Sequence, residues 1–472
     1  MDASRREFVA GAAVAGMLGW SSALRAQPVL TPEVFGAKGD GRTNDTAAFA
    51  ALSAYVNKRG GGTIILRPVT YIVGAHSPRA SVHLGGQKAI GAFPAGDILH
   101  FVSCSGPVVL RGNGATLRAA AGLKFGTFDP ITGRPFEHQM PFTKREFIAS
   151  PYVGMIFAER CSGLIDISDL ELDGNIEGLN VGGRYGDTGW QIPAAGIHLS
   201  DNLGAERLSR IHSHHHALDG LQLYSVPGRL ASTVLQDVRC EYNGRQGCSL
   251  TGGRNYVFEN CRFLHTGRSK LQSAPGAGVD IEAGTHPIRN VSFSNCEFSN
   301  NTGCGMVADS GDTSDVSFDG CRFVGTSSWS AWPNKPRFRF TSCLFVGALV
   351  HPYGDVNPSQ ATRFVGCDFK DDPALSPTGK IYFGGNIRHP VVNAAAARNV
   401  IFEHCRFGLT HEGGLPFTSQ VIYSDCDLSQ TYGVRSNPRG TYTGTNRITG
   451  NVDISGSPIR GQVLLNGRAY SG

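Results

Sequence analysis

The sequence lacks several features that would assign it to common classes of protein. Charged residues make up only 17% of its 472 residues, and no run of Lys and Arg marks a nucleic-acid-binding arm or a polybasic membrane patch. None of the 12 cysteines has the C-x-x-C spacing of a metal site. Hydrophobic residues nevertheless reach 40%, enough for a large core. We therefore expect a folded protein that does not bind nucleic acid.

An apolar stretch near the N-terminus runs only from Val9 to Ala23, whereas a transmembrane helix needs ~20 residues. It follows the segment Ser4-Arg5-Arg6-Glu7-Phe8, and Ala26 offers a cleavage position. This pattern resembles a twin-arginine export signal. We expect residues 1–26 to be removed, the mature chain to lack a membrane span, and the protein to be periplasmic or secreted. The alternative is an N-terminal membrane anchor.

Glycine is abundant, at 62 residues, and short apolar segments recur along the chain. Seven of these segments share the pattern apolar-x-apolar-x-x-Cys-x-apolar. Apart from loop insertions, their spacing is near 22 to 25 residues, which is the period of one coil of a β-solenoid. The cysteines of these segments are Cys261, Cys296, Cys321, Cys343, Cys367, Cys405 and Cys426.

Such coils must stack at the ~4.8 Å spacing of strands, because each buries only one face of its short strands. Equivalent cysteines then form an internal ladder of buried, reduced thiols. A second strand repeats in the same register, beginning at a glycine in each coil. Its period of two predicts that one set of side chains points inward. This set is Ile197, Leu221, Cys248 and Val279.

The beginning of the mature chain carries a different motif. Residues 35–49 contain Phe-Gly-Ala-Lys-Gly-Asp-Gly-Arg-Thr-Asn-Asp-Thr-Ala-Ala-Phe, and a Gly-Gly-Thr-Ile-Ile-Leu strand follows at 61–66. This phrase resembles the pectate-lyase-like superfamily of right-handed parallel β-helix proteins. The residues between, 47–57, are expected to form a helix that begins after Asp45 or Thr46 and, in that family, covers the open end of the solenoid.

The predicted fold is therefore all-β, a single-stranded right-handed parallel β-helix (solenoid) with a short N-terminal capping helix. We expect the cap over residues 27–75, the β-helix over 76–430, and a last coil or closing hairpin over 431–472. Residues 123–150, 176–193 and 326–337 interrupt the repeat and are expected to be loops that could wall a binding groove.

The alternation of the second strand also predicts a row of polar side chains on the outer surface, a candidate groove. This row consists of His198, Gln222, Tyr224, Ser249, Thr251, Asp280 and Glu282. The turns before these strands concentrate titratable and cationic side chains. Cations beside a groove suit an acidic polysaccharide, since Arg and Lys neutralise a uronate. The expected substrate-binding residues are His198, Gln222, Asn243, Thr251, His265, Arg268 and Lys270.

Cleavage of a uronate-containing chain by β-elimination needs a charge neutraliser, a base for the C5 proton and an acid for the leaving oxygen. Arg245 or Lys270, a histidine such as His214 or His216, and Tyr224 could supply these functions. For each one alone, the plain alternative is a solvated loop residue.

Three carboxylates form another candidate set. Asp280 and Glu282, at i and i+2 on one strand, share a face about 7 Å apart and could act in catalysis or bind Ca²⁺ with waters. Asp219 lies two coils earlier, a spacing near the ~6.5–9.5 Å of inverting glycoside hydrolysis. No other cofactor is indicated. The alternative for the first two is capping of a turn or pairing with Arg254 or Arg289.

The sequence thus predicts a secreted carbohydrate-active enzyme that cleaves an acidic polysaccharide by β-elimination, a polysaccharide lyase, with a glycoside hydrolase or a C5-epimerase as alternatives. A non-catalytic glycan-binding protein is the alternative from another class. The successive motifs of polygalacturonases and the Arg-containing strand motif of calcium-dependent pectate lyases do not occur, so no catalytic residue transfers from either group. The sequence does not predict an oligomeric state.

Overall fold

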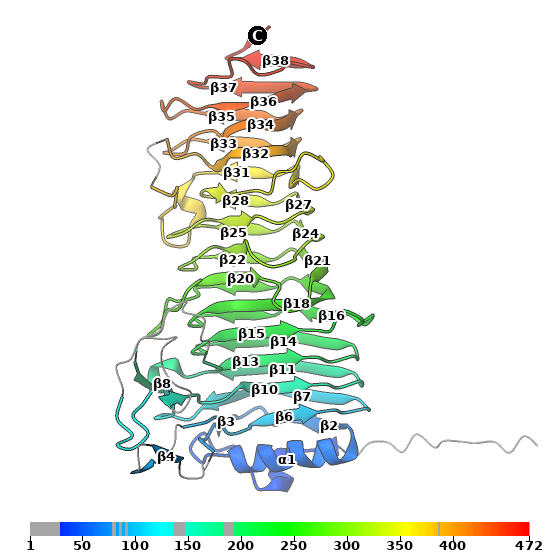
Figure 1. Cartoon of the computed structure of the whole chain (residues 1–472), viewed down its shortest axis with the longest axis vertical. Coiled ribbons are helices and arrows are strands. Elements are labelled where there is room, and N and C mark those ends of the chain that lie inside the picture. The colour runs from blue at the N-terminus through cyan, green and yellow to red at the C-terminus, as the bar shows by residue number, and fades with distance from the viewer. Residues whose placement is uncertain are drawn as a thin grey trace, which may run out of the picture.

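The computed structural model describes residues 29–77, 82–84, 87–89, 93–135, 147–183, 192–385 and 388–471. The predicted export signal lies outside these ranges. Over the described residues the chain winds into a tall stack of coils, with one helix at one end and the C-terminal strands at the other (Figure 1). The chain is therefore an all-β parallel solenoid with a capping helix, as predicted.

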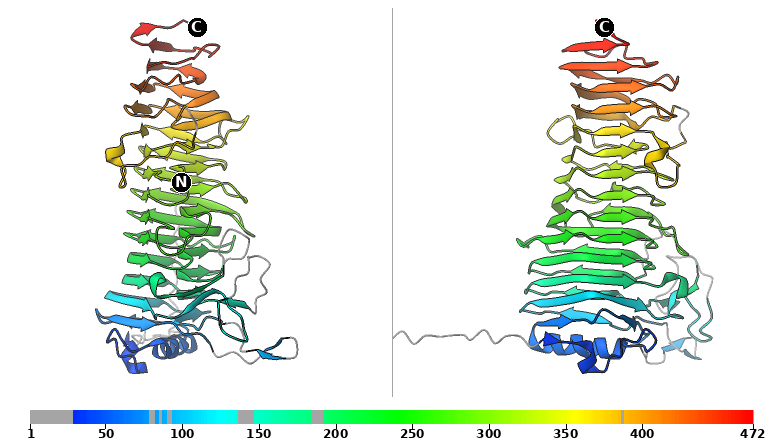
Figure 2. Two further views of the ribbon diagram at one scale, coloured as in Figure 1. Left: turned by 90° about the vertical axis from the view of Figure 1, so that its left-hand side faces the viewer. Right: turned by 180° about the vertical axis from the view of Figure 1, so that it is seen from behind.

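Each coil contributes strands to three parallel sheets, which we name faces A, B and C. The two further views in Figure 2 show the same regular stack from the side and from behind. Some strands bend at a corner and belong to two faces.

Face A pairs strands β6 to β34 in parallel. Its members are β6 (Leu99–Val102), β10 (Gly154–Glu159), β13 (Ala195–Ser200), β15 (Asp219–Tyr224), the start of β18 (Gln246–Glu259), β20 (Ala277–Ile281), β23 (Met306–Ala308), β26 (Ala331–Pro333), β29 (Leu349–Val350), and the starts of β32 (Val392–Glu403) and β34 (Phe417–Ser424).

Face B includes the ends of β18, β32 and β34. Its other members are β1 (Val29–Leu30), β2 (Gly62–Ile65), the starts of β7 (Val108–Ala119), β11 (Ile165–Asp173) and β14 (Glu206–His214), then β16 (Thr233–Gln236), β21 (Ile288–Ser294), β24 (Val316–Asp319), β27 (Phe338–Thr341), β30 (Arg363–Val365) and β36 (Pro438–Thr443).

Face C contains the ends of β7, β11 and β14. Its other members are β3 (Thr70–Val73), β17 (Arg239–Glu241), β19 (Arg262–Leu264), β22 (Glu297–Ser299), β25 (Arg322–Val324), β28 (Leu344–Val346), β31 (Asp368–Lys370), β33 (Arg406–Leu409), β35 (Asp427–Gln430), β37 (Thr445–Thr449) and β38 (Gln462–Leu465).

The remaining elements lie at the ends and in the loops. Helix α1 (Thr46–Arg59) begins directly after Asp45, and β38 pairs antiparallel with β39, so the C-terminal segment adds a parallel coil and then a closing hairpin. The short elements are η1 (Pro32–Phe35), η3 (Ile176–Gly178), η4 (Pro373–Leu375), β4 (Val82–Leu84), β5 (Gln87–Ala89), β8 (Lys124–Thr127), β9 (Ile148–Ala149), β12 (Asn180–Gly182) and β39 (Arg468–Ala469).

The corner between faces B and C explains the cysteine repeat. The residue before each repeated cysteine has a left-handed backbone, for example Asn260 at φ 54° and Asn295 at φ 52°. Asn, Asp and Gly tolerate this conformation best. The following thiol faces inward and meets backbone carbonyls, as Cys343 Sγ does at 3.3 Å from Thr341 O. All twelve cysteines are buried and unbridged, which confirms the predicted thiol ladder.

Two continuous columns of aromatic rings fill the core beside these corners. One column runs from Phe258 to Tyr442 and the other from Phe263 to Phe407, with neighbouring ring centroids 4.3–5.5 Å apart. Buried aromatic rings supply large apolar area with additional stacking energy. The columns fix the register of successive coils, and therefore also the position of every side chain on the outer surface.

No helix among the described residues is long and apolar enough to cross a membrane.

Candidate functional site

Face A carries a row of outward side chains that continues through eight successive coils, which we call the outer ladder. The inward row beneath it is the predicted one, since Ile197, Leu221, Cys248 and Val279 pair in register and are fully buried. The outer ladder consists of His100, Phe157, His198, Gln222, Ser249, Asp280, Val307 and Trp332. At ~4.8 Å per coil it is about 34 Å long, and Ser249, Asp280 and Val307 within it are buried.

The two ends of the outer ladder are aromatic or apolar. His100, Phe157 and His198 stack with ring centroids 4.6 Å apart at each step, and burial lowers the pKa of His198 to about 4. At the other end Val307 packs with Trp332 in a small apolar cluster outside the main core. Aromatic rings thus flank the polar centre at both ends, although His100 also pairs with Asp97 and Glu159 at 3.3 and 3.0 Å.

The centre of the ladder is a carboxylate cluster formed by Asp219, Arg245, Gln246, Asp280 and Glu282. Arg245 forms a two-pronged ion pair with the fully buried Asp219, with Nε 2.8 Å from Oδ1 and the second prong to Oδ2. Gln222 donates its amide to Asp219 Oδ2 at 3.0 Å, which connects this pair to the outer ladder. The Nε and Nη2 groups of the guanidinium are therefore engaged by Asp219.

Asp280 occupies a different environment in the same cluster. It is 5% exposed and hydrogen-bonded to the side-chain amide of Gln246. Burial and the nearby Glu282 carboxylate raise the pKa of Asp280 to about 7, against an opposing effect of Arg245. The carboxyl is thus half protonated near neutral pH, as a general acid requires.

Glu282 is the accessible member of the cluster. The neighbours Ile281 and Ala283 point into the core, so the predicted alternation holds and Glu282 is an exposed residue that faces outward. Its Oε1 accepts a hydrogen bond from Ser310 Oγ at 2.5 Å. On an extended strand its Cα lies ~7 Å from that of Asp280, which places one buried acid and one exposed carboxylate on the same surface.

Two predicted members of the polar row fall out of register. The pairing of β15 with β18 shifts by one residue after Leu223, so Tyr224 lies opposite Gly252 and Thr251 has no partner in the row. Tyr224 stacks instead on His286, with ring centroids 5.5 Å apart. Because it stands at the far end of β15, five residues from Asp219, it is about 16 Å away along the strand.

His214 and His216 lie on opposite sides of the backbone, one on the outer surface and one inside the solenoid. His215 has a left-handed backbone with φ 54°, which breaks the strand alternation. His214 therefore lies on the outer surface of face C, against Glu171. His216 lies inside, fully buried, with its Nδ1 2.9 Å from Tyr152 Oη, and burial holds its pKa well below the usual range. Neither histidine joins the carboxylate cluster.

The remaining predicted binding residues make structural contacts in the turns. Asn243 is fully buried and accepts from His216 N at 3.0 Å. Lys270 donates to the carbonyl of Leu179 at 2.9 Å, and Arg268 donates to the carbonyl of Asn300 at 3.2 Å. His265 bonds to the Asn300 amide and stacks on Tyr242. The basic turns are thus engaged with backbone and neighbouring coils.

Four residues lie on this surface that the sequence pattern did not predict there: Phe157, Gln246, Val307 and Trp332. The position of Gln246 was predictable, because it stands directly before its glycine, as Asp219 does. Trp332 belongs to a three-residue strand after a long insertion, where alternation gives no guidance.

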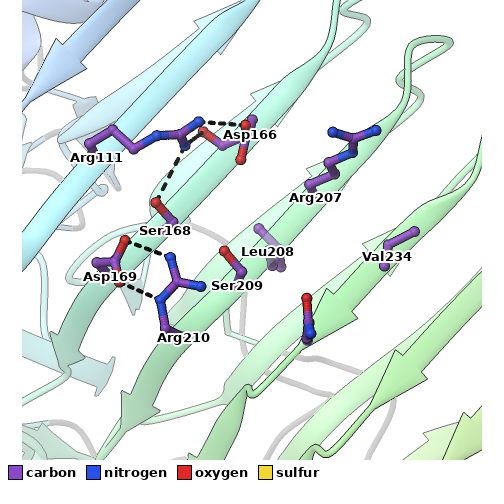
Figure 3. Close-up of a pocket in the computed structure, with 10 residues that line it drawn as sticks. Arg111, Asp166, Ser168, Asp169, Arg207, Leu208, Ser209, Arg210 and Val234 are labelled. Atoms are coloured by element: carbon purple, nitrogen blue, oxygen red, sulfur yellow. Dashed lines mark hydrogen bonds and ion pairs between the residues drawn. The ribbon is translucent and has the colours of Figure 1, made fainter.

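A hollow of about 440 Å³ lies on the outer surface of face B, and Figure 3 shows the residues that line it. Arg111 pairs with Asp166 at 2.6 Å and Arg210 pairs with Asp169, with Nε 2.5 Å from Oδ1. The hydrogen bonds from Arg210 lower the pKa of Asp169, so no proton donor is prepared there. This surface could bind an anion but lacks the paired acid and carboxylate of face A.

Comparison with known proteins agrees with the fold. A family model described as the right handed beta helix region matches residues 157–347. No curated protein matches the sequence.

Among solved structures, the A-module of a mannuronan C-5 epimerase from Azotobacter vinelandii has a TM-score of 0.43 at 14% identity, over 92% of this chain and 97% of that chain. Gene product 12 of bacteriophage phi29 has a TM-score of 0.49 at 14% identity, over 93% and 57%. A capsular polysaccharide depolymerase, the tailspike of an Acinetobacter baumannii bacteriophage, has 0.43 at 13% identity, over 89% and 63%. Identities this low concern the fold alone.

Proposed function

We propose that this protein is a carbohydrate-active enzyme that hydrolyses a glycosidic bond of a polysaccharide on the outer ladder of face A. One observation carries the proposal. The buried carboxyl of Asp280, whose pKa is raised to about 7, shares a surface with the exposed carboxylate of Glu282. Two carboxyl groups in opposite environments are the acid and base pair of glycoside hydrolysis.

In this mechanism Asp280 protonates the leaving glycosidic oxygen, and Glu282 accepts a proton from the attacking water. Their Cα atoms are ~7 Å apart on an extended strand. Inversion of configuration requires the two carboxyl groups to stand ~6.5–9.5 Å apart with a water molecule between them. The hydrogen bond from Gln246 positions Asp280, and Arg245 acts on the Asp280 carboxyl through its charge. The long ladder gives adjacent sugar rings a surface on both sides of the cleaved bond.

β-Elimination on a uronate is the second candidate, because a carboxyl with a pKa of about 7 could also serve as the base for the C5 proton. It ranks below hydrolysis because the cations expected to neutralise the uronate are engaged elsewhere: Arg245 by Asp219, and Lys270 by backbone carbonyls. A C5-epimerase would use the same proton abstraction, and a non-catalytic binding protein would use the ladder alone.

A panel of neutral and uronate-containing polysaccharides distinguishes these functions. Hydrolysis produces new reducing ends without ultraviolet absorbance, whereas elimination also leaves an absorbing C=C bond on the product. The variants Asp280→Asn and Glu282→Gln should each lose about 10²–10⁴-fold in kcat. The matched controls Asp319→Asn and Glu259→Gln remove exposed carboxylates of face B and should keep full activity. Absorbing product, or full activity in both cluster variants, contradicts the proposal.

We also propose that the protein is exported to the periplasm or medium, on the strength of the Arg5-Arg6 pair and the apolar stretch that follows. Replacing Arg5 and Arg6 with Lys should retain the chain in the cytoplasm, as cell fractionation would detect. Unchanged export of that variant would contradict a twin-arginine route.

A further inference from the structure

Face C carries a second group of chemically active side chains, separate from the carboxylate cluster. Glu171, His212 and His214 each offer one ligand atom, and these three atoms lie within 4.8 Å of one another. The closest pair is Glu171 Oε1 and His214 Nε2, 2.9 Å apart. Glu171 and His212 retain solvent access, with side chains 41% and 36% exposed, whereas the His214 side chain is 11% exposed.

The β-helix itself brings these three residues together. His212 and His214 stand at i and i+2 on β14, so both point to the outer surface of face C. Glu171 lies on the preceding coil, directly opposite His212 in the register of β11 and β14. The aromatic rings of the two histidines are 4.2 Å apart between centroids. The rigid register of two coils therefore presets the positions of all three ligands.

We propose that Glu171, His212 and His214 form a binding site for a divalent transition-metal ion of the Zn²⁺ type. Two imidazoles and one carboxylate are donors that suit Zn²⁺, whereas Ca²⁺ and Mg²⁺ prefer oxygen ligands alone. At ~2.0–2.1 Å from a tetrahedral zinc, neighbouring ligand atoms lie ~3.4 Å apart. The three ligand atoms are 2.9 Å apart at the closest pair and at most 4.8 Å apart, which brackets this spacing. Glu171 and His212 are partly exposed, whereas His214 is buried.

Each of the three proposed ligand side chains also forms a hydrogen bond with a residue outside the ligand set. Thr116 Oγ1 donates to the other carboxylate oxygen of Glu171 at 2.7 Å. His212 Nε2 lies 2.8 Å from Glu241 Oε1, and Nδ1 of His212 has no hydrogen bond within the described part of the chain. His214 Nδ1 lies 2.7 Å from His215 Nδ1.

Glu241 is in turn fixed by Arg239 at 2.6 Å. Carboxylate and hydroxyl partners of this kind orient ligands and set the tautomer of a coordinating imidazole. Three protein ligands leave a fourth position for water, which is the arrangement of a reactive rather than a purely structural zinc site. The site lies on a different face from the carboxylate cluster, so it stands independently of the proposed hydrolysis.

A neighbouring group defines the alternative ligand set. Asp173, His214 and His215 also bring three ligand atoms within 4.8 Å. Asp173 Oδ1 is, however, 3.9 Å from His214 Nδ1, and the two ring nitrogens of His214 and His215 already bond to each other. We therefore assign the site to Glu171 and His212, with His214 shared, and treat the Asp173 set as an outcome of the test.

The test titrates Co²⁺ into untagged, chelator-treated full-length mature protein and follows the visible d–d absorption of the ion. We expect one Co²⁺ per chain, displacement of that ion by Zn²⁺, and a rise in Tm when the metal is in excess. The variants His212→Ala and Glu171→Gln should each weaken Co²⁺ binding at least 10-fold. Far-ultraviolet circular dichroism confirms that both variants fold, and Glu171→Gln retains the shape of the side chain.

His404→Ala is the matched control, because His404 lies at a distant corner of the solenoid, and its Co²⁺ affinity should stay within 2-fold of wild type. Absence of the Co²⁺ spectrum in the wild-type protein would overturn the proposal, as would wild-type affinity in both ligand variants. Stronger loss of binding in Asp173→Asn than in Glu171→Gln would overturn this ligand set.

Discussion

The raised pKa of Asp280 has a direct consequence for stability. Folding shifts this pKa from 3.8 to about 7, so between these values the folded protein binds a proton that the unfolded chain does not. Stability should therefore fall as pH rises from about 4 to about 7, and the full cost is present above pH 7. The isosteric variant Asp280→Asn carries no charge and escapes this cost.

The size of the effect follows from the same shift. About 3 pKa units at ~1.36 kcal/mol each correspond to about 4 kcal/mol, as an upper estimate. For 472 residues, an unfolding entropy of ~2.1 cal/mol/K per residue gives ~1 kcal/mol/K, so this is about 4 °C in Tm. Asp280→Asn should thus melt about as high as wild type at pH 4 and about 4 °C higher at pH 8.

Thermal melts followed by circular dichroism at several pH values measure this difference. Asp319→Asn, which removes an exposed carboxylate, is the control for the loss of one Asp side chain. A Tm difference for Asp280→Asn that does not depend on pH, or that becomes negative above pH 7, would refute the assigned environment of Asp280. Gain of stability with loss of activity is the expected signature of a functional carboxyl.

Three further predictions concern the framework that positions the site. Phe323 stacks between Phe298 and Phe345, with ring centroids 4.7 and 4.9 Å apart. Phe323→Ala should therefore lower the free energy of unfolding, measured with denaturant, by about 3–5 kcal/mol. A loss below about 1 kcal/mol would count against the aromatic columns. Arg229 is buried 2.9 Å from Glu206, so Arg229→Met should lower the free energy of unfolding by about 3–5 kcal/mol, because it leaves the buried Glu206 charge unpaired. Adding Glu206→Gln to this variant should restore part of the lost stability. No recovery in the double variant would contradict the pairing. The twelve buried thiols should react with a thiol reagent only in denaturant, and rapid labelling of native protein would disprove the internal ladder.

The repeat made most of the fold predictable. The spacing of the repeated cysteines predicted the length of one coil and the ladder of buried, reduced thiols. The apolar residue at every second position predicted the inward row. The row from His198 through Gln222 and Ser249 to Asp280 follows from alternation alone, and its register is as expected. Asp280 and Glu282 were recognisable as neighbours because nothing interrupts the alternation between them.

The rest of the site depended on local backbone departures that alternation does not encode. One extra residue in β18 places Thr251 out of the row. The left-handed backbone of His215 places His214 on the outer surface and His216 inside the solenoid. Lys270 was expected beside the substrate, yet its ammonium reaches backbone carbonyls of a coil about 90 residues earlier. Such long-range contacts arise from loop packing, which the repeat pattern leaves unspecified.

The most direct test of the central claim is the pH dependence of kcat/KM on the polysaccharide that the panel identifies. If Asp280 is the proton donor, it must be protonated in the free enzyme, so kcat/KM should fall as pH rises through about 7. A profile that instead rises through pH 7 would mean that the same carboxyl acts as a base, and would contradict hydrolysis at this site.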